Sequence, residues 1–220
     1  MDKAQLFQFL STQDASFLLN LLSTAYDQMN RDQRRWVFGK LVEKSPPAPV
    51  DGEVLLDEVE EFRRQSLAKV YYKPFKINSK NWMHVPEKTE EWFDRLGDLL
   101  KATRQLTVRG DHLHAVACFS ILYELIGALE RGEEIVFGDE IGSWMIPGDE
   151  KQYVAAYMTS LAATATPEEF TAAALPLIRR DSWQSFTTQA YPSAIRPANE
   201  AQKAYLEAEI QRQNVRTGAE

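Results

Sequence analysis

Apolar side chains recur at helical spacing along most of this chain of 220 residues. In an amphipathic helix, apolar residues return every three or four positions, and Phe17 and Leu21 begin such a pattern. Asp14 is the expected N-cap of this helix, and Asn30, with a glutamine three residues later, resembles the capping box of a second one. A connection this short requires the two helices to run roughly antiparallel, so residues 14–44 are predicted to form a helical hairpin.

The same pattern predicts a series of later helices. The segment 111–130 is apolar on nearly all sides, which indicates a central buried helix. Thr166 is the strongest helix start, because proline and then glutamate follow it at the positions that favour capping. Pro176 is expected to kink or shorten the helix that begins there. The other predicted helices span about 51–72, 86–107, 149–163, 182–190 and 198–212.

Three segments interrupt the helices. The proline-rich stretch 45–50 favours a stiff, extended connection, interpreted as a rigid loop in preference to a domain boundary or a proline-motif ligand. Residues 73–85 lack periodicity and form the first long loop. In the second irregular segment, 131–148, the triplets 135–137 and 144–146 are long enough for two short strands at most.

These elements together predict an all-α fold built of stacked antiparallel helical hairpins, either helical-repeat-like or an orthogonal bundle. Helix is expected in about 60% of residues or more, with β-structure limited to one minor hairpin near 133–147. A single helical domain, 1–220, is predicted, with the alternative of an N-terminal hairpin subdomain, 1–44, joined by the linker 45–50. No repeat consensus with a period near 34 or 40 residues is present.

Composition and charge narrow the class of protein. The chain is 44% hydrophobic and 26% charged, as in ordinary globular proteins, and its net charge of −7 argues against a nucleic-acid partner. The single cysteine excludes a disulfide framework and, with no visible export signal, favours the cytoplasm. The longest apolar region, 113–129, is interrupted by polar residues, so no membrane span is expected.

No motif for nucleotide binding or nucleophilic catalysis is present, so no cofactor is predicted. His114 and Cys118 have the spacing of two ligands on one helix face, but the chain has no second cluster to complete a zinc site. A buried thiol and partly buried histidines are therefore expected. Glu124 lies on a face of small residues that would allow its burial, and a structural ion pair or hydrogen bond is favoured over a catalytic acid.

Charge is segregated along the chain. Residues 63–88 carry a net charge of +6, and residues 131–151 carry a net charge of −4. The basic stretch also contains Tyr71, Tyr72, Phe75 and Trp82, which could stack on a ligand or anchor a loop. We expect the basic stretch to dock against the acidic one, because the opposite charges then pair with each other without a ligand.

Stacked helices, segregated charge and the absence of catalytic motifs favour a non-enzymatic scaffold that binds another protein. The alternative is an enzyme or a binder of a small anionic ligand, with a pocket between the loops 73–85 and 133–147. Because the helices 86–107 and 111–130 are joined by a short turn, both loops are expected at one end of that pair. The residues predicted to line this pocket are Lys73, Lys80, Asn81, Trp82, His84, Asp139, Glu140 and Trp144.

Overall fold

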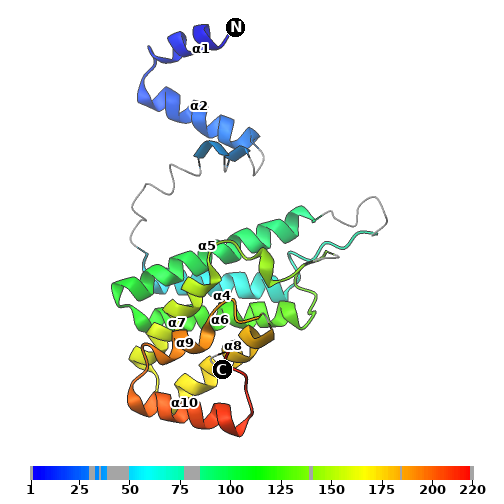
Figure 1. Cartoon of the computed structure of the whole chain (residues 1–220). Coiled ribbons are helices and arrows are strands. Elements are labelled where there is room, and N and C mark those ends of the chain that lie inside the picture. The colour runs from blue at the N-terminus through cyan, green and yellow to red at the C-terminus, as the bar shows by residue number, and fades with distance from the viewer. Residues whose placement is uncertain are drawn as a thin grey trace. The chain divides into compact units, whose positions relative to one another are not determined.

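The structure is a computed structural model (Figure 1) and describes residues 2–29, 33–34, 36–38, 50–76, 85–138, 141–183 and 185–218. It is 73% helix, and no strand occurs in these ranges, which confirms the all-α prediction. The finer prediction of stacked hairpins stays a prediction. The chain divides into two compact units, Met1–Pro49 and Val50–Glu220, and each is described by itself.

The first unit contains α1 (Lys3–Leu10) and α2 (Ala15–Gln28). The sequence pattern did not predict α1, although Asp2 caps it with a complete capping box. Asp14 accepts a hydrogen bond from the backbone N–H of Phe17 at 2.8 Å, which confirms the predicted N-cap of α2. Of the second predicted helix, 33–34 and 36–38 are helical; 30–32, 35 and 39–49 lie outside the described residues.

The second unit is built around α4 (Gly52–Leu67), α5 (Glu87–Arg109) and α6 (His112–Glu130), which pack against one another (Figure 1). The prediction of a central buried helix at 111–130 is confirmed, because α6 also packs on α7 and its Leu122 and Ile126 are fully buried. A tight turn at Gly110 joins α5 to α6. Its φ of 83° lies in the left-handed region, which glycine adopts without strain.

By length and composition, α6 would be able to cross a membrane. Half of its most apolar window is nevertheless buried inside the second unit, where it contacts α4, α5 and α7. The apolar character of this helix is thus explained by its place in the core, and the described residues give no strong sign of a membrane protein.

The remaining elements are η1 (Ser143–Met145), α7 (Glu150–Thr164), α8 (Pro167–Trp183), α9 (Ala190–Ile195) and α10 (Glu200–Arg212). The predicted cap of α8 is confirmed: Thr166 N–H donates to Glu169 Oε2 at 2.9 Å, and Glu169 N–H donates to Thr166 Oγ1 at 3.3 Å. Pro176 does not end α8, which continues to Trp183. Pro176 is exposed, so its ring lies on the surface side of α8.

The sequence allowed at most one minor hairpin near 133–147, and no strand occurs among the described residues of this segment. Residues 144 and 145 belong to the 3-10 helix η1, and residues 135–137 form no strand. The backbone of Phe137 is instead satisfied by a side chain of α5: its N–H donates to Thr89 Oγ1 at 3.2 Å, and its carbonyl accepts from the same hydroxyl at 2.7 Å. Ile135 and Val136 are buried in the core, so apolar burial holds this segment without a β-ladder.

Two predicted helix boundaries are wrong. The helix expected to reach about residue 72 ends at Leu67, because Lys69 has a φ of 59° and turns the chain. The helix expected at 182–190 is replaced by the end of α8, a turn and the start of α9. Left-handed backbone at Ser185, Phe186 and Gln189 interrupts the helical path there.

Candidate functional site

Only two of the predicted pocket residues are described, Lys73 and Trp144, and both are exposed. Lys80, Asn81, Trp82, His84, Asp139 and Glu140 lie outside the described residues. Whether the eight residues cluster at one end of the α5–α6 pair therefore stays a prediction.

The described parts of the two loops do contact each other. The Phe75 and Phe137 rings meet edge to face with centroids 5.3 Å apart, and the Tyr72 ring lies 5.7 Å from that of Phe137. Lys69 forms an ion pair with Glu134, which also accepts a hydrogen bond from the Tyr72 hydroxyl at 3.4 Å. The expected docking of the basic stretch against the acidic one is confirmed for these residues.

An open hollow of about 600 Å³ lies beside this contact. Tyr72, Phe137 and Trp144 supply aromatic walls, and Glu130, Glu133 and Glu134 line it as well. The Trp144 side chain is 75% exposed, so the hollow has a stacking surface available to solvent. Its acidic lining is the opposite of what an anionic ligand requires.

Several large apolar side chains are exposed together on α1 and α2. None of the residues described in the first unit is buried. The large apolar side chains that these two helices expose, from 41% to 66%, are Phe7, Phe9, Phe17, Leu19, Leu21, Leu22 and Tyr26. Trp36, in the helical segment that follows, is 86% exposed. Large exposed apolar areas mark sites of interaction, since a monomer gains nothing by leaving them in water.

One row of these side chains has a regular spacing. Ala15, Leu19, Leu22 and Tyr26 all lie on the exposed surface of α2, at intervals of four, three and four residues; we call this row the α2 stripe. Apolar residues at alternating intervals of three and four form the seam of two helices packed side by side. Among the described residues of the first unit, Arg34 lies over the Tyr26 ring at 4.6 Å, and the Phe38 ring lies tilted beside it with centroids 5.5 Å apart.

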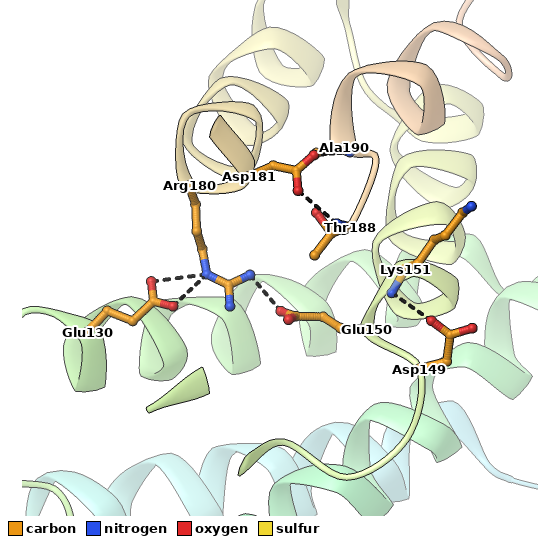
Figure 2. Close-up of polar contacts among 8 residues, drawn as sticks. All are labelled: Glu130, Asp149, Glu150, Lys151, Arg180, Asp181, Thr188 and Ala190. Carbon is orange, nitrogen blue, oxygen red and sulfur yellow. Dashed lines mark hydrogen bonds and ion pairs between the residues drawn. The ribbon is translucent and has the colours of Figure 1, made fainter. Parts of the chain in front are cut away.

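A cluster of three charged side chains joins helices of the second unit. Arg180 on α8 donates through Nε to both carboxylate oxygens of Glu130 on α6, at 2.8 and 3.0 Å (Figure 2). Through Nη1 it donates to Glu150 at the start of α7, at 2.5 Å. The Arg180 side chain is only 12% exposed. We call Arg180, Glu130 and Glu150 the ionic cluster.

In the ionic cluster, burial and the neighbouring charges shift the pKa of each group in opposite directions. Burial raises the pKa of Glu150 above its ordinary value, even though Arg180 lies beside it. Burial also disfavours the charge on Arg180, but its pairs with Glu150 and Glu130 outweigh this effect and raise the pKa of Arg180. The arginine is therefore charged at every accessible pH, and the cluster ties three helices together.

A groove of about 770 Å³ runs beside the ionic cluster, between α6 and α8, with Tyr157 of α7 among its lining residues. Trp183 lines it and is 89% exposed. Tyr123 OH and Arg180 Nη2 have no hydrogen-bond partner among the described residues, but both atoms are enclosed by neighbouring groups, with less than 1 Å² accessible. A molecule lying in the groove would therefore not reach either of these two atoms.

The other titratable residues singled out in the sequence have structural contacts. His112 Nδ1 lies 3.1 Å from Ser160 Oγ, and His114 Nδ1 lies 2.9 Å from a carboxylate oxygen of Asp111. Cys118 is fully buried, as expected. Glu124 pairs with Arg63 at 3.2 Å, which confirms the favoured ion pair. Its side chain is 55% exposed, so the burial that its small neighbours would allow does not occur. Within the described ranges, no group of three metal-ligating side chains occurs.

No protein-family model, curated protein or solved structure matches this chain with significance. Function is therefore inferred from the residues and geometry of the chain itself. The sequence analysis noticed the apolar residues of α2 but not the α2 stripe, although its spacing was visible. It also missed the ionic cluster, whose members lie 20, 30 and 50 residues apart.

Proposed function

We propose that this chain is a non-enzymatic helical scaffold that binds another protein chain through the apolar surface of α1 and α2. The observation that carries the proposal is that none of the residues described in the first unit is buried, although the unit is rich in phenylalanine and leucine. A segment of this size buries a smaller fraction of its surface than a larger domain does, and partners commonly supply further burial. The second unit, with its own core, serves as the rigid body that carries this surface.

The proposal includes a cytoplasmic location. It is supported by the one thiol of the chain, Cys118, which is free and buried, as is common where the environment is reducing. The acidic second unit and the apolar first unit also suit a protein partner better than a nucleic acid, which would need a basic surface.

A second candidate is the binding of a small ligand in the hollow beside Tyr72 and Trp144. The specific observation in its favour is the exposed Trp144 ring on a wall of that hollow. The acidic lining favours a neutral or cationic aromatic ligand over the anionic one expected from the sequence. Thermal stabilisation of the full chain by such a ligand, lost in Trp144→Ala, tests this candidate.

The test of the main proposal is site-specific photo-crosslinking in living cells that produce the full chain. A photoreactive amino acid replaces Leu19, which is 66% exposed on the α2 stripe. The matched control replaces Leu113, which is 73% exposed on α6 in the second unit. We expect one discrete covalent adduct at position 19 and none at position 113.

A second substitution shows whether the adduct depends on the surface itself. Leu22→Glu places a charge in the middle of the α2 stripe and should abolish the adduct at position 19, because burying an unpaired carboxylate is costly. No adduct at position 19, or an adduct equally strong at position 113, contradicts the proposed function.

A further inference from the structure

We propose that a hollow beside Trp183 binds a small phosphorylated compound that carries an aromatic ring, with its phosphate on Arg179 and Arg216 and its ring on Trp183. The hollow has a volume of about 330 Å³, near the lower end of the range for small-ligand sites. The end of α8 supplies part of its lining, and residues 213–216, after α10, supply the rest. This site does not involve the α2 stripe, so it goes beyond the proposed function.

The lining of this hollow is basic, although it belongs to an acidic unit. Residues 50–220 contain nineteen basic and twenty-seven acidic residues, a net charge of −8. Among the described residues that line the hollow, Arg179 and Arg216 are charged and none is aspartate or glutamate. The hollow beside Trp144 and the groove beside the ionic cluster are both lined by glutamates. An anion is therefore repelled from those two sites and attracted to this one.

Both arginines are held by contacts that leave their charge uncompensated. Arg179 donates through Nη2 to the side-chain carbonyl of Gln213, a neutral group. The Arg216 guanidinium lies over the Phe186 ring, 6.0 Å from its centroid, a contact that occupies its face and leaves the N–H groups at its edge. Glu209, which also contacts Gln213, is itself paired with another arginine. Neither arginine of the hollow is ion-paired with a carboxylate in the described part of the chain.

Two guanidinium groups suit a phosphate better than a carboxylate. A phosphate monoester carries a charge of about −1.5 to −2 at neutral pH and three strong acceptor oxygens. One phosphate can therefore accept from both Arg179 and Arg216, whereas the two oxygens of a carboxylate match the fork of a single arginine.

Trp183 supplies the contact for the ring. It is the last residue of α8, and its side chain is 89% exposed although it borders the hollow. An exposed indole is a flat surface on which another aromatic ring stacks, as bases do on proteins that bind single strands. A ligand with both a ring and a phosphate would use Trp183 and the two arginines together.

The part of the chain that carries Arg216 is fixed by its own contacts. Asn214 has a φ of 50° and turns the chain back after α10, and Val215 N–H donates to a carbonyl of that helix at 3.0 Å. Gly218 lies against the Phe186 ring, which a Cβ at this position would meet at 2.6 Å. The lining is therefore formed before a ligand arrives, and binding need not order it.

The test is calorimetric titration of the purified full chain with adenosine monophosphate. Adenosine and inorganic phosphate are the controls, because each carries only one of the two recognised groups. We expect the nucleotide to bind about tenfold more tightly than either control, and its binding to weaken as the salt concentration rises. Phosphotyrosine is the second probe, since it carries the same phosphate on another ring. The tighter of the two probes shows whether the source of the ligand is a free nucleotide or a modified side chain.

Substitutions show whether the probe lies in this hollow. Arg216→Gln and Trp183→Ala should each weaken binding of the tighter probe about tenfold or more. The matched controls, Arg196→Gln and Trp144→Ala, should leave it unchanged, because both side chains are exposed and neither lines the hollow. Circular dichroism confirms that each variant keeps its helices.

Three results would overturn the inference: neither probe binds, the tighter probe binds no better than inorganic phosphate, or its binding is unchanged in Arg216→Gln and Trp183→Ala. Each of these results leaves the photo-adduct at position 19 unaffected, so this inference and the proposed function stand or fall separately.

Discussion

Among single residues, Arg180 shows most clearly how a buried charge is accommodated. Its guanidinium reaches Glu130 through one nitrogen and Glu150 through another, a fork that lysine cannot reproduce (Figure 2). The carboxylate of Asp181, the next residue, is buried and accepts from the backbone N–H of Thr188 at 2.8 Å and of Ala190 at 2.9 Å. These two adjacent side chains therefore connect three helices and hold one turn.

Glu150 should make stability depend on pH in a definite direction. Because burial raises its pKa in the folded chain, the native state binds a proton more tightly than the unfolded state. Its contribution to the free energy of unfolding therefore falls as pH rises from the unfolded pKa, 4.5, through the raised native pKa. Denaturant titrations of wild type and Glu150→Gln at a series of pH values test this. The free energy of unfolding of wild type, relative to that of Glu150→Gln, should increase as pH falls. A difference that stays constant, or that decreases as pH falls, would contradict the raised pKa of Glu150.

The thiol of Cys118 should be almost inert in the folded chain. Burial raises its pKa to about 11, so almost no thiolate, the reactive form, is present at neutral pH. Labelling by a thiol reagent should be slow in buffer and fast in denaturant. Rapid labelling of the native chain would mean that α6 opens readily and is not the central helix.

At the scale of elements, packing decides most of what the structure shows. Periodicity located α5 and α6 to within about two residues, because each has a continuous buried face. The pattern was less informative where the backbone is held by non-local contacts. The turn after α8 depends on Asp181, and the segment at 135–137 depends on Thr89, 48 residues away. Neither partnership leaves a trace in local spacing, which is why a helix was predicted over 182–190 and a short hairpin was allowed near 133–147.

Truncation of a fully buried residue on α6 tests its place in the core. Leu122→Ala should lower the free energy of unfolding by about 2–5 kcal/mol, the usual cost of a core cavity. Leu113→Ala on the same helix, where the side chain is 73% exposed, should change it by less than about 0.5 kcal/mol. Equal effects of the two substitutions in denaturant titration would show that α6 is not packed as described.

The turn between α8 and α9 should depend on a single carboxylate. Asp181→Ala leaves two buried backbone N–H groups without an acceptor, at a cost of about 2 kcal/mol or more. Asp149→Ala is the matched control, because Asp149 is an exposed cap of α7 whose loss should cost about 1 kcal/mol. Thermal unfolding that ranks Asp149→Ala as the more damaging change would contradict this role for Asp181.

At the scale of the whole molecule, the two units differ in what they leave unsatisfied. The second unit has an extensive core and pairs its buried charges. The first unit has exposed phenylalanine, leucine and tryptophan side chains and no buried residue in its described part. The scaffold hypothesis was reached from the sequence, but the surface that supports it was not, because exposure depends on what fails to pack and not on the pattern of one helix. The proposed partner supplies that missing packing.

The accessibility of position 22 in living cells tests this account most directly. In Leu22→Cys the new thiol lies on the α2 stripe, while Cys118 is buried and does not react. If the stripe is an interface, a cell-permeant thiol reagent should label Leu22→Cys many times more slowly than Leu113→Cys, and equally fast after denaturation. Equal labelling of the two variants in cells would mean that the stripe stays open to solvent, and it would contradict the proposed interaction surface.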